Sequence, residues 1–240
     1  YNKAILINPE YKKAYNNRGN VMRELGMLNQ AVKNYDKAIT IESNNPDSYV
    51  NRGTIFYELR NFSKASKDYI KAIHLKKNYA EAYFSLANVF NETGANKDAI
   101  ENYKTAIKIN PNYAEAFNNL GNLYNKLKKY HEAIICFEKA IRINPNFNFL
   151  YGTLIQTKCI ICDWKSFKKD IKNLEKNIEI KKKIAPPFLT LSLFDSPQIQ
   201  KNASIIWCED KFFKSKNIYF ENKKINKKVR IGYYSADFGE

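Results

Sequence analysis

The sequence repeats itself every 34 residues. The stretch AYNNRGNVMRELGMLNQAVKNYDKAI, which begins at Ala14, recurs in altered form as SYVNRGTIFYELRNFSKASKDYIKAI, AYFSLANVFNETGANKDAIENYKTAI and AFNNLGNLYNKLKKYHEAIICFEKAI. A small residue, two aromatic positions and two alanine positions keep this spacing in nearly every copy: Gly19, Gly53, Ala87 and Gly121; Tyr15, Tyr49, Tyr83 and Phe117; Tyr35, Tyr69, Tyr103 and Phe137; Ala31, Ala65, Ala99 and Ala133; Ala38, Ala72, Ala106 and Ala140. A fixed period of this length predicts a solenoid, in which each unit packs against its neighbours.

The period and the order of these residues resemble the tetratricopeptide repeat, which implies two antiparallel helices in each unit. The small residue lets the first helix approach the second, and the aromatic rings fill the space between neighbouring units. INPEY, INPNY and INPNF end repeats where proline cannot continue a helix. We expect first helices over 12–25, 46–59, 80–93 and 114–127, and second helices over 28–41, 62–75, 95–109 and 130–143.

The array is expected to curve so that its first helices line a concave groove for an extended peptide. Two positions after the first aromatic residue stand Asn17, Asn51, Ser85 and Asn119. An asparagine amide offers both a donor and an acceptor, so such a row can bind peptide backbone whatever its side chains. The alternative is that an asparagine-rich chain places amides there by chance.

The 34-residue register ends near Phe147, and a capping helix to about residue 161 is expected. Next, CDWKSFKKDIKNLEKNIEIKKK has apolar residues at helical spacing and predicts an amphipathic helix. Pro186 and Pro187 predict an extended entry to the following segment, and Ser196 and Pro197 predict the start of another helix. A lysine-rich linker then leads to KVRIGYYSADFGE, which is typical of a buried strand that enters a glycine turn.

The order of these segments resembles the O-linked N-acetylglucosamine transferase family with its SPINDLY-like members, the family 41 glycosyltransferases. PFLTLSLFDSPQIQKNASIIWCEDKF and VRIGYYSADFG carry this resemblance. It implies a GT-B enzyme that transfers a sugar, most simply N-acetylglucosamine, from a UDP or GDP sugar to serine or threonine of a protein that the repeats present. It also implies that residues 229–239 form the first strand and turn of a Rossmann-like half. The asparagine row matches the peptide-binding positions of that family, with Ser85 as the departure.

The expected fold is thus an all-α tetratricopeptide superhelix of four full repeats and a partial one, followed by linker helices and the first β-strand of a truncated GT-B domain. The corresponding domains are 1–146, 147–227 and 228–240. No catalytic or donor-binding residue is expected in this chain, since the histidine and the nucleotide site of that family would follow Glu240. Ser235 and Asp237 are candidates only for positions near the active site. The Asp-Phe-Gly triplet at 237–239 lacks the other motifs of a kinase.

Two other functions remain open from the sequence. One is a scaffold without catalysis, whose repeats bind partner proteins. The other is nucleic-acid binding through lysines between Lys165 and Lys228, because 40 basic and 24 acidic residues give a net charge of +16. Compositional drift towards lysine, asparagine and isoleucine also accounts for that charge.

The remaining features of the sequence bear on location and cofactors. No apolar run reaches the roughly 20 residues that cross a bilayer, so we expect a cytoplasmic protein that does not bind membranes. Cys159 and Cys162 form a single CxxC, and the sequence offers no further ligands at the spacing of a zinc site. Idle thiols in a reducing compartment are expected, with a redox role as the alternative. No cofactor is expected beyond the sugar donor of a complete enzyme.

Overall fold

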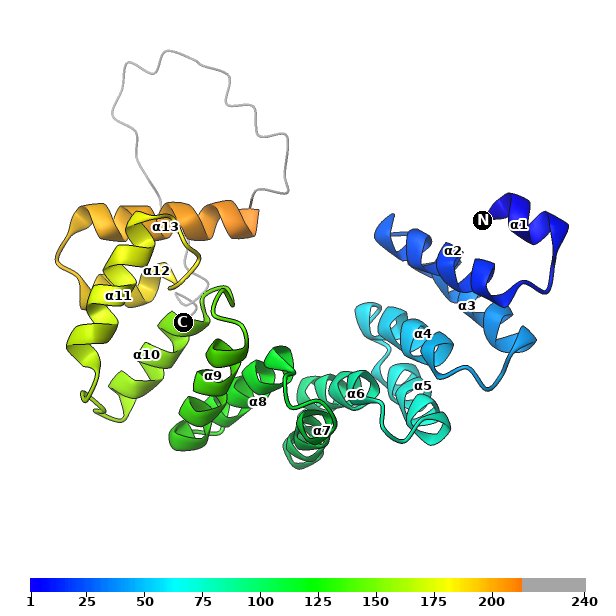
Figure 1. Ribbon diagram of the computed structural model, residues 1–240, viewed down its shortest axis with the longest axis horizontal. Coiled ribbons are helices and arrows are strands. Elements are labelled where there is room, and N and C mark those ends of the chain that lie inside the picture. Colours follow the sequence, from blue (N-terminus) through cyan, green and yellow to red (C-terminus); the bar gives the residue numbers. More distant parts are fainter. Residues whose placement is uncertain (213–240) are drawn as a thin grey trace, which may run out of the picture.

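The computed structural model describes residues 1–212, and these residues form an open arc of helices (Figure 1). Thirteen helices and no strand occur within 1–212. The helix α1 (Asn2–Ile7) is followed by four helix pairs. The first helices of the pairs are α2 (Lys12–Glu24), α4 (Pro46–Glu58), α6 (Ala80–Glu92) and α8 (Ala114–Lys126). The second helices are α3 (Leu28–Ile41), α5 (Phe62–Leu75), α7 (Asn96–Ile109) and α9 (Tyr130–Ile143).

The bounds predicted for these eight helices are confirmed to within one residue. Each pair is joined by a short turn that contains a residue with left-handed backbone. Gly26 and Gly94 supply this conformation in two repeats, with φ of 74° and 79°. Arg60 and Lys128 adopt it in the other two, with φ of 57° and 58°. The packing of the two helices therefore imposes the left-handed conformation in the turn even on Arg60 and Lys128, which do not favour it.

The predicted close approach of the two helices is confirmed at the small residues. A Cβ atom added to Gly19 would lie 2.6 Å from the ring of Tyr35, and one added to Gly121 would lie 2.6 Å from the ring of Phe137. Both rings are almost completely buried, with exposures of 1% and 0%. Because real Cβ atoms do not approach a ring so closely, only glycine fits there unless the ring moves.

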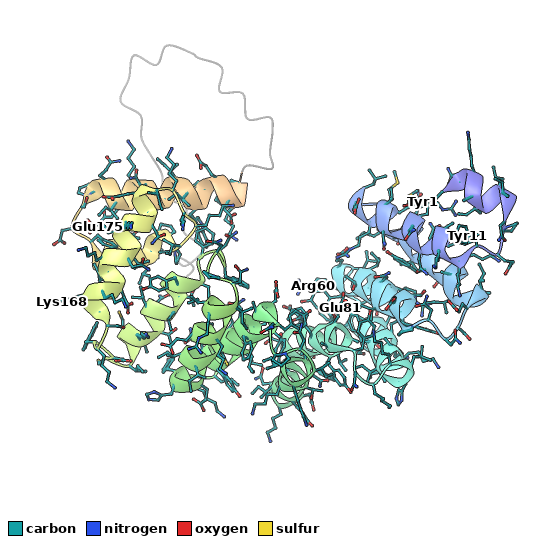
Figure 2. The ribbon with its side chains drawn as sticks, in the orientation of Figure 1. Tyr1, Tyr11, Arg60, Glu81, Lys168 and Glu175 are labelled. Atoms are coloured by element: carbon teal, nitrogen blue, oxygen red, sulfur yellow. The ribbon has the colours of Figure 1, made fainter. Side chains whose placement is uncertain are left out.

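Four further helices complete the described part of the chain. They are α10 (Leu150–Ile160), α11 (Phe167–Glu179), α12 (Pro187–Leu193) and α13 (Pro197–Phe212). The helix α10 packs on α9 and caps the array. The four helices α10 to α13, here called the C-terminal bundle, share a second hydrophobic core that includes Ile155, Leu174, Leu189 and Ile206. Lys168 lies on the outer side of α11 in Figure 2, away from this core.

The segment between α11 and α12 is held against the start of α10. The backbone N–H of Phe149 donates to the carbonyl of Lys183 (2.5 Å), and that of Gly152 donates to the carbonyl of Ile184 (2.9 Å). A Cβ on Gly152 would lie 2.7 Å from Cα of Ala185. This backbone contact joins α10, which packs on the last repeat, to the rest of the C-terminal bundle.

The helices predicted after the repeats are largely confirmed. The capping helix, the amphipathic helix and the helix that starts at Pro197 are present as α10, α11 and α13. Pro186 has extended backbone, with φ −70° and ψ 151°. The prediction of extended structure is wrong for Pro187, which is the first residue of α12, because proline is well suited to the first position of a helix. The strand predicted over 228–240 lies outside the described residues.

Candidate functional site

The inner wall of the arc is built from the first helices of the repeats. In Figure 1, α4 and α6 lie on the inner side of the arc, and their partners α5 and α7 lie on the outer side. Polar side chains link each first helix to the next. Asn16 Nδ2 donates to Ser48 Oγ (2.9 Å), and Arg23 forms an ion pair with Glu58 (2.6 Å). These bonds hold consecutive first helices together along the inner wall.

The predicted amide row has one member on each of the first helices α2, α4, α6 and α8. Asn17 is exposed, and Asn51, Ser85 and Asn119 are partly exposed. They do not cluster, since each belongs to a different repeat. Neither Asn17 nor Asn51 makes a side-chain hydrogen bond within residues 1–212. The amides of Asn17 and Asn51 are therefore free to bind an extended backbone.

The amide of Asn119 is held by its neighbours. Its Nδ2 donates to Asn88 Oδ1 (3.0 Å), and its Oδ1 accepts from Asn118 Nδ2 (3.2 Å). Asn119 still has one N–H and one lone pair available, because a side-chain amide can form four hydrogen bonds. The side chain of Asn119, the fourth member of the row, is thus oriented by its hydrogen bonds to Asn88 and Asn118.

A second row of polar residues lies three positions further along the first helices of three repeats. Asn20, Thr54 and Asn88 accept hydrogen bonds from the buried hydroxyls of three second-helix tyrosines. The pairs are Tyr35 with Asn20 (2.7 Å), Tyr69 with Thr54 (3.4 Å) and Tyr103 with Asn88 (2.6 Å). Burial raises the pKa of Tyr35 and of Tyr69 to about 12. The constant separation of 15 residues between acceptor and tyrosine was the sequence signal for these pairs.

The other candidate residues contribute little to this wall. Ser235 and Asp237 lie outside the described residues. The thiol of Cys159 is partly buried and that of Cys162 is exposed, and no disulfide joins them. Within 1–212, no three histidine, cysteine or acidic side chains lie close enough together to hold a metal ion. In the same part of the chain, no helix has both the length and the apolar character needed to span a bilayer.

Family models of the tetratricopeptide repeat match the array. One such model matches residues 114–147 and another matches 1–33, and a third, described as TPR repeat, matches 19–60, 54–94 and 87–128. Together they span residues 1–147, which is more than half of the chain. A comparison with curated proteins gives no match.

Several solved structures have the same fold. The crystal structure of MamA protein is 26% identical with a TM-score of 0.62, over 71% of this chain and 96% of that one. YrrB, described as a TPR protein with an unusual peptide-binding site, is 18% identical with a TM-score of 0.58, over 84% and 96%. PilF of Pseudomonas aeruginosa is 17% identical with a TM-score of 0.63, over 85% and 93%. With its repeat pattern, its helix pairs and these matches, the chain belongs to the tetratricopeptide repeat family.

Proposed function

We propose that the protein is a scaffold that binds an extended segment of a partner protein along the inner wall of its arc. The observation that carries this proposal is the row of amides on successive first helices, in which Asn17 and Asn51 have no partner within residues 1–212. Backbone amides recur along an extended peptide, so a row of side-chain amides matches them without selecting a sequence. MamA, at 26% identity, has the same repeat fold.

The test is an array of random 12-residue peptides, probed with the full chain, followed by measurement of affinities for the peptides that bind. The variant Asn17→Ala, Asn51→Ala and Asn119→Ala is expected to weaken binding at least tenfold, since each hydrogen bond contributes about 0.5–1.5 kcal/mol. A control variant carries Asn29→Ala, Asn102→Ala and Asn173→Ala, which removes two exposed amides from α3 and α11 and a partly exposed one from α7. Equal affinities for the two variants would contradict the proposed binding mode.

A finer proposal is that this scaffold is the acceptor-binding and linker part of a protein O-glycosyltransferase. The order of segments supports it, because the array continues into a helical bundle and then into residues 229–239, whose sequence resembles the start of a family 41 catalytic domain. The donor would be a UDP or GDP sugar, and the acceptors would be serine or threonine side chains. An assay of label transfer from UDP-N-acetylglucosamine and GDP sugars by the complete natural protein tests this. Absence of transfer to any bound peptide would leave the scaffold as the function.

A further inference from the structure

The part of the inner wall formed by α4, α6 and α8 is acidic, whereas α2 and the chain as a whole are basic. The helices α4, α6 and α8 carry five acidic residues (Asp47, Glu58, Glu81, Glu92 and Glu115) and two basic residues (Arg52 and Lys126), so their sum is 2 − 5 = −3. The chain as a whole has a net charge of +16. Arg52 is turned towards the second helices, where it forms an ion pair with Asp68 (2.6 Å). The charge of α4, α6 and α8 therefore favours a cationic side chain of the partner along that part of the wall.

Two aromatic rings lie together where α6 and α8 begin, and two of these carboxylates lie in the first turns of the same helices. The ring centroids of Phe84 and Tyr113 are 4.8 Å apart, with an angle of 40° between the planes. Glu81 precedes Phe84 by three residues on α6, so the two share a face of that helix. Glu115 lies in the first turn of α8, two residues after Tyr113. We call Glu81, Phe84, Tyr113 and Glu115 the acidic aromatic patch.

Both carboxylates of the patch are exposed, and neither forms an ion pair within the described residues. Burial raises the pKa of Tyr113, and the charges of Glu81 and then Glu115 raise it further. Both charges therefore act on the same phenol ring from neighbouring helices. Figure 2 shows Glu81 towards the open side of the arc, where a bound segment can reach it.

In the preceding repeat, a cation lies over the tyrosine that is equivalent to Tyr113. There, the ring of Tyr79 has the ammonium of Lys76 4.4 Å from its centroid, and its hydroxyl donates to Asp47 Oδ1 (2.7 Å). Tyr79 and Asp47 stand 34 residues before Tyr113 and Glu81. One repeat of this chain thus combines a lysine with a tyrosine and a carboxylate at the positions of Tyr113 and Glu81, although there the tyrosine hydroxyl is bonded to the carboxylate.

The cation is missing from the equivalent position one repeat later. The residue that corresponds to Lys76 is Asn110. Among the described residues, no lysine or arginine lies over the ring of Tyr113 or Phe84, and the hydroxyl of Tyr113 makes no hydrogen bond. Lys77 and Lys108 line a separate hollow beside Tyr83, and neither is within ion-pair distance of Glu81 or Glu115. The patch presents two carboxylates and two ring faces without a cation of its own.

We propose that the acidic aromatic patch binds a lysine or arginine side chain of the segment held along the inner wall. The two carboxylates attract the cation, and the ring faces stabilise it through cation–π contact. This inference rests on the proposed binding of an extended segment. Binding to the amide row requires no particular side chain in the partner, whereas binding to the patch requires a positive side chain at one fixed position.

The first test uses a small probe and does not depend on peptide binding by the rest of the wall. Nα-acetyl-lysine methylamide is titrated into the 15N-labelled full chain, and amide shifts are followed by NMR. Nα-acetyl-norleucine methylamide is the control, because it has a similar apolar stem without the ammonium. We expect shifts in residues 80–85 and 112–116 with the lysine probe alone. Equal shifts with both probes, or no shifts with either, would overturn the inference.

The second test uses the peptides selected on the array. Glu81→Gln with Glu115→Gln is expected to weaken binding of lysine-containing or arginine-containing peptides about 2- to 30-fold, since each exposed ion pair contributes about 0.2–1 kcal/mol. A control with Glu101→Gln and Glu179→Gln makes the same charge change on α7 and α11. Phe84→Leu is expected to weaken binding about 2- to 30-fold by removing a ring face.

The outcomes of the second test separate this inference from the proposed function. If peptides bind but show no preference for lysine or arginine at a fixed position, the patch does not select a cation and the scaffold proposal stands. If the two charge variants weaken binding equally, the effect is one of net charge and the inference fails. If no peptide binds the full chain, the proposed function itself fails.

Discussion

Gly121→Ala tests whether close helix packing, and not helix propensity, decides the residue at this position. Gly121 lies within α8, and an added Cβ would be 2.6 Å from Cε1 and 2.7 Å from Cδ1 of Phe137. It would also be 3.2 Å from Cβ of Cys136. Phe137 has no exposed surface, so its ring has no open space into which it can retreat.

Two opposing effects set the size of the change. Alanine is favoured over glycine inside a helix by roughly 0.5–1 kcal/mol. Forcing a methyl group into a filled core costs about 1–3 kcal/mol. Because the ring must move by about 1 Å to restore an ordinary contact, we expect a net loss of about 1–2 kcal/mol. For a chain of this size that corresponds to a fall in Tm of about 2–8 °C.

The assay is thermal unfolding followed by circular dichroism at 222 nm. The double variant Gly121→Ala with Phe137→Leu is expected to lose less stability than the sum of the two single changes, because the smaller side chain makes room for the methyl group. Ala87→Gly, at the equivalent position of the preceding repeat, is expected to lower Tm through helix propensity and the loss of a buried methyl group. An unchanged or higher Tm for Gly121→Ala would refute the reasoning.

Three further predictions concern other parts of the molecule. Gly152→Ala is expected to release the segment before α12, because the added methyl group would lie 2.7 Å from Cα of Ala185. Hydrogen exchange of the backbone amides of Phe149 and Gly152 should then accelerate at least tenfold. Burial raises the pKa of Tyr69 from 10.0 to about 12, so its contribution to stability is present below pH 10 and is lost as pH rises towards 12. The last part of the rise in tyrosine absorbance at 295 nm should then coincide with alkaline unfolding, and completion of that rise before the protein unfolds would contradict this. Burial also raises the pKa of the Cys136 thiol to about 11, so at pH 8 a disulfide reagent should label the exposed Cys162 and Cys208 at least 100-fold faster than Cys136, and equal rates would contradict the buried position.

The helix pairs could be predicted because the same residue pattern occurs in each of the four repeats. Four copies of one spacing outweigh the departures within any single copy, such as Arg60 in a turn position that favours glycine. The bounds of α2 to α9 followed from the period, and the close contact at Gly19 followed from its size.

The parts that were missed depend on contacts between residues far apart in the chain. The hydrogen bond from Asn119 to Asn88 joins two repeats, and no local pattern shows it. The short helix α12 was missed because paired prolines were taken to exclude helix, although Pro187 begins one. The sequence did not reveal the acidic aromatic patch, because glutamates such as Glu81 and Glu115 are common in the first turn of a helix. Their negative charge there interacts favourably with the helix dipole.

The helix α10 contributes to two hydrophobic cores at once. Leu150 and Leu154 pack with the array, whereas Ile155, together with Phe149 just before the helix, belongs to the core of the C-terminal bundle. A fragment that ended before α10 would uncover the last repeat, and one that ended just after it would uncover the other face of α10. Over evolution, repeats can be gained or lost within the array without changing this helix, but a substitution in α10 must suit two neighbours together. We therefore expect α10 to accept fewer changes than any repeat helix that it caps.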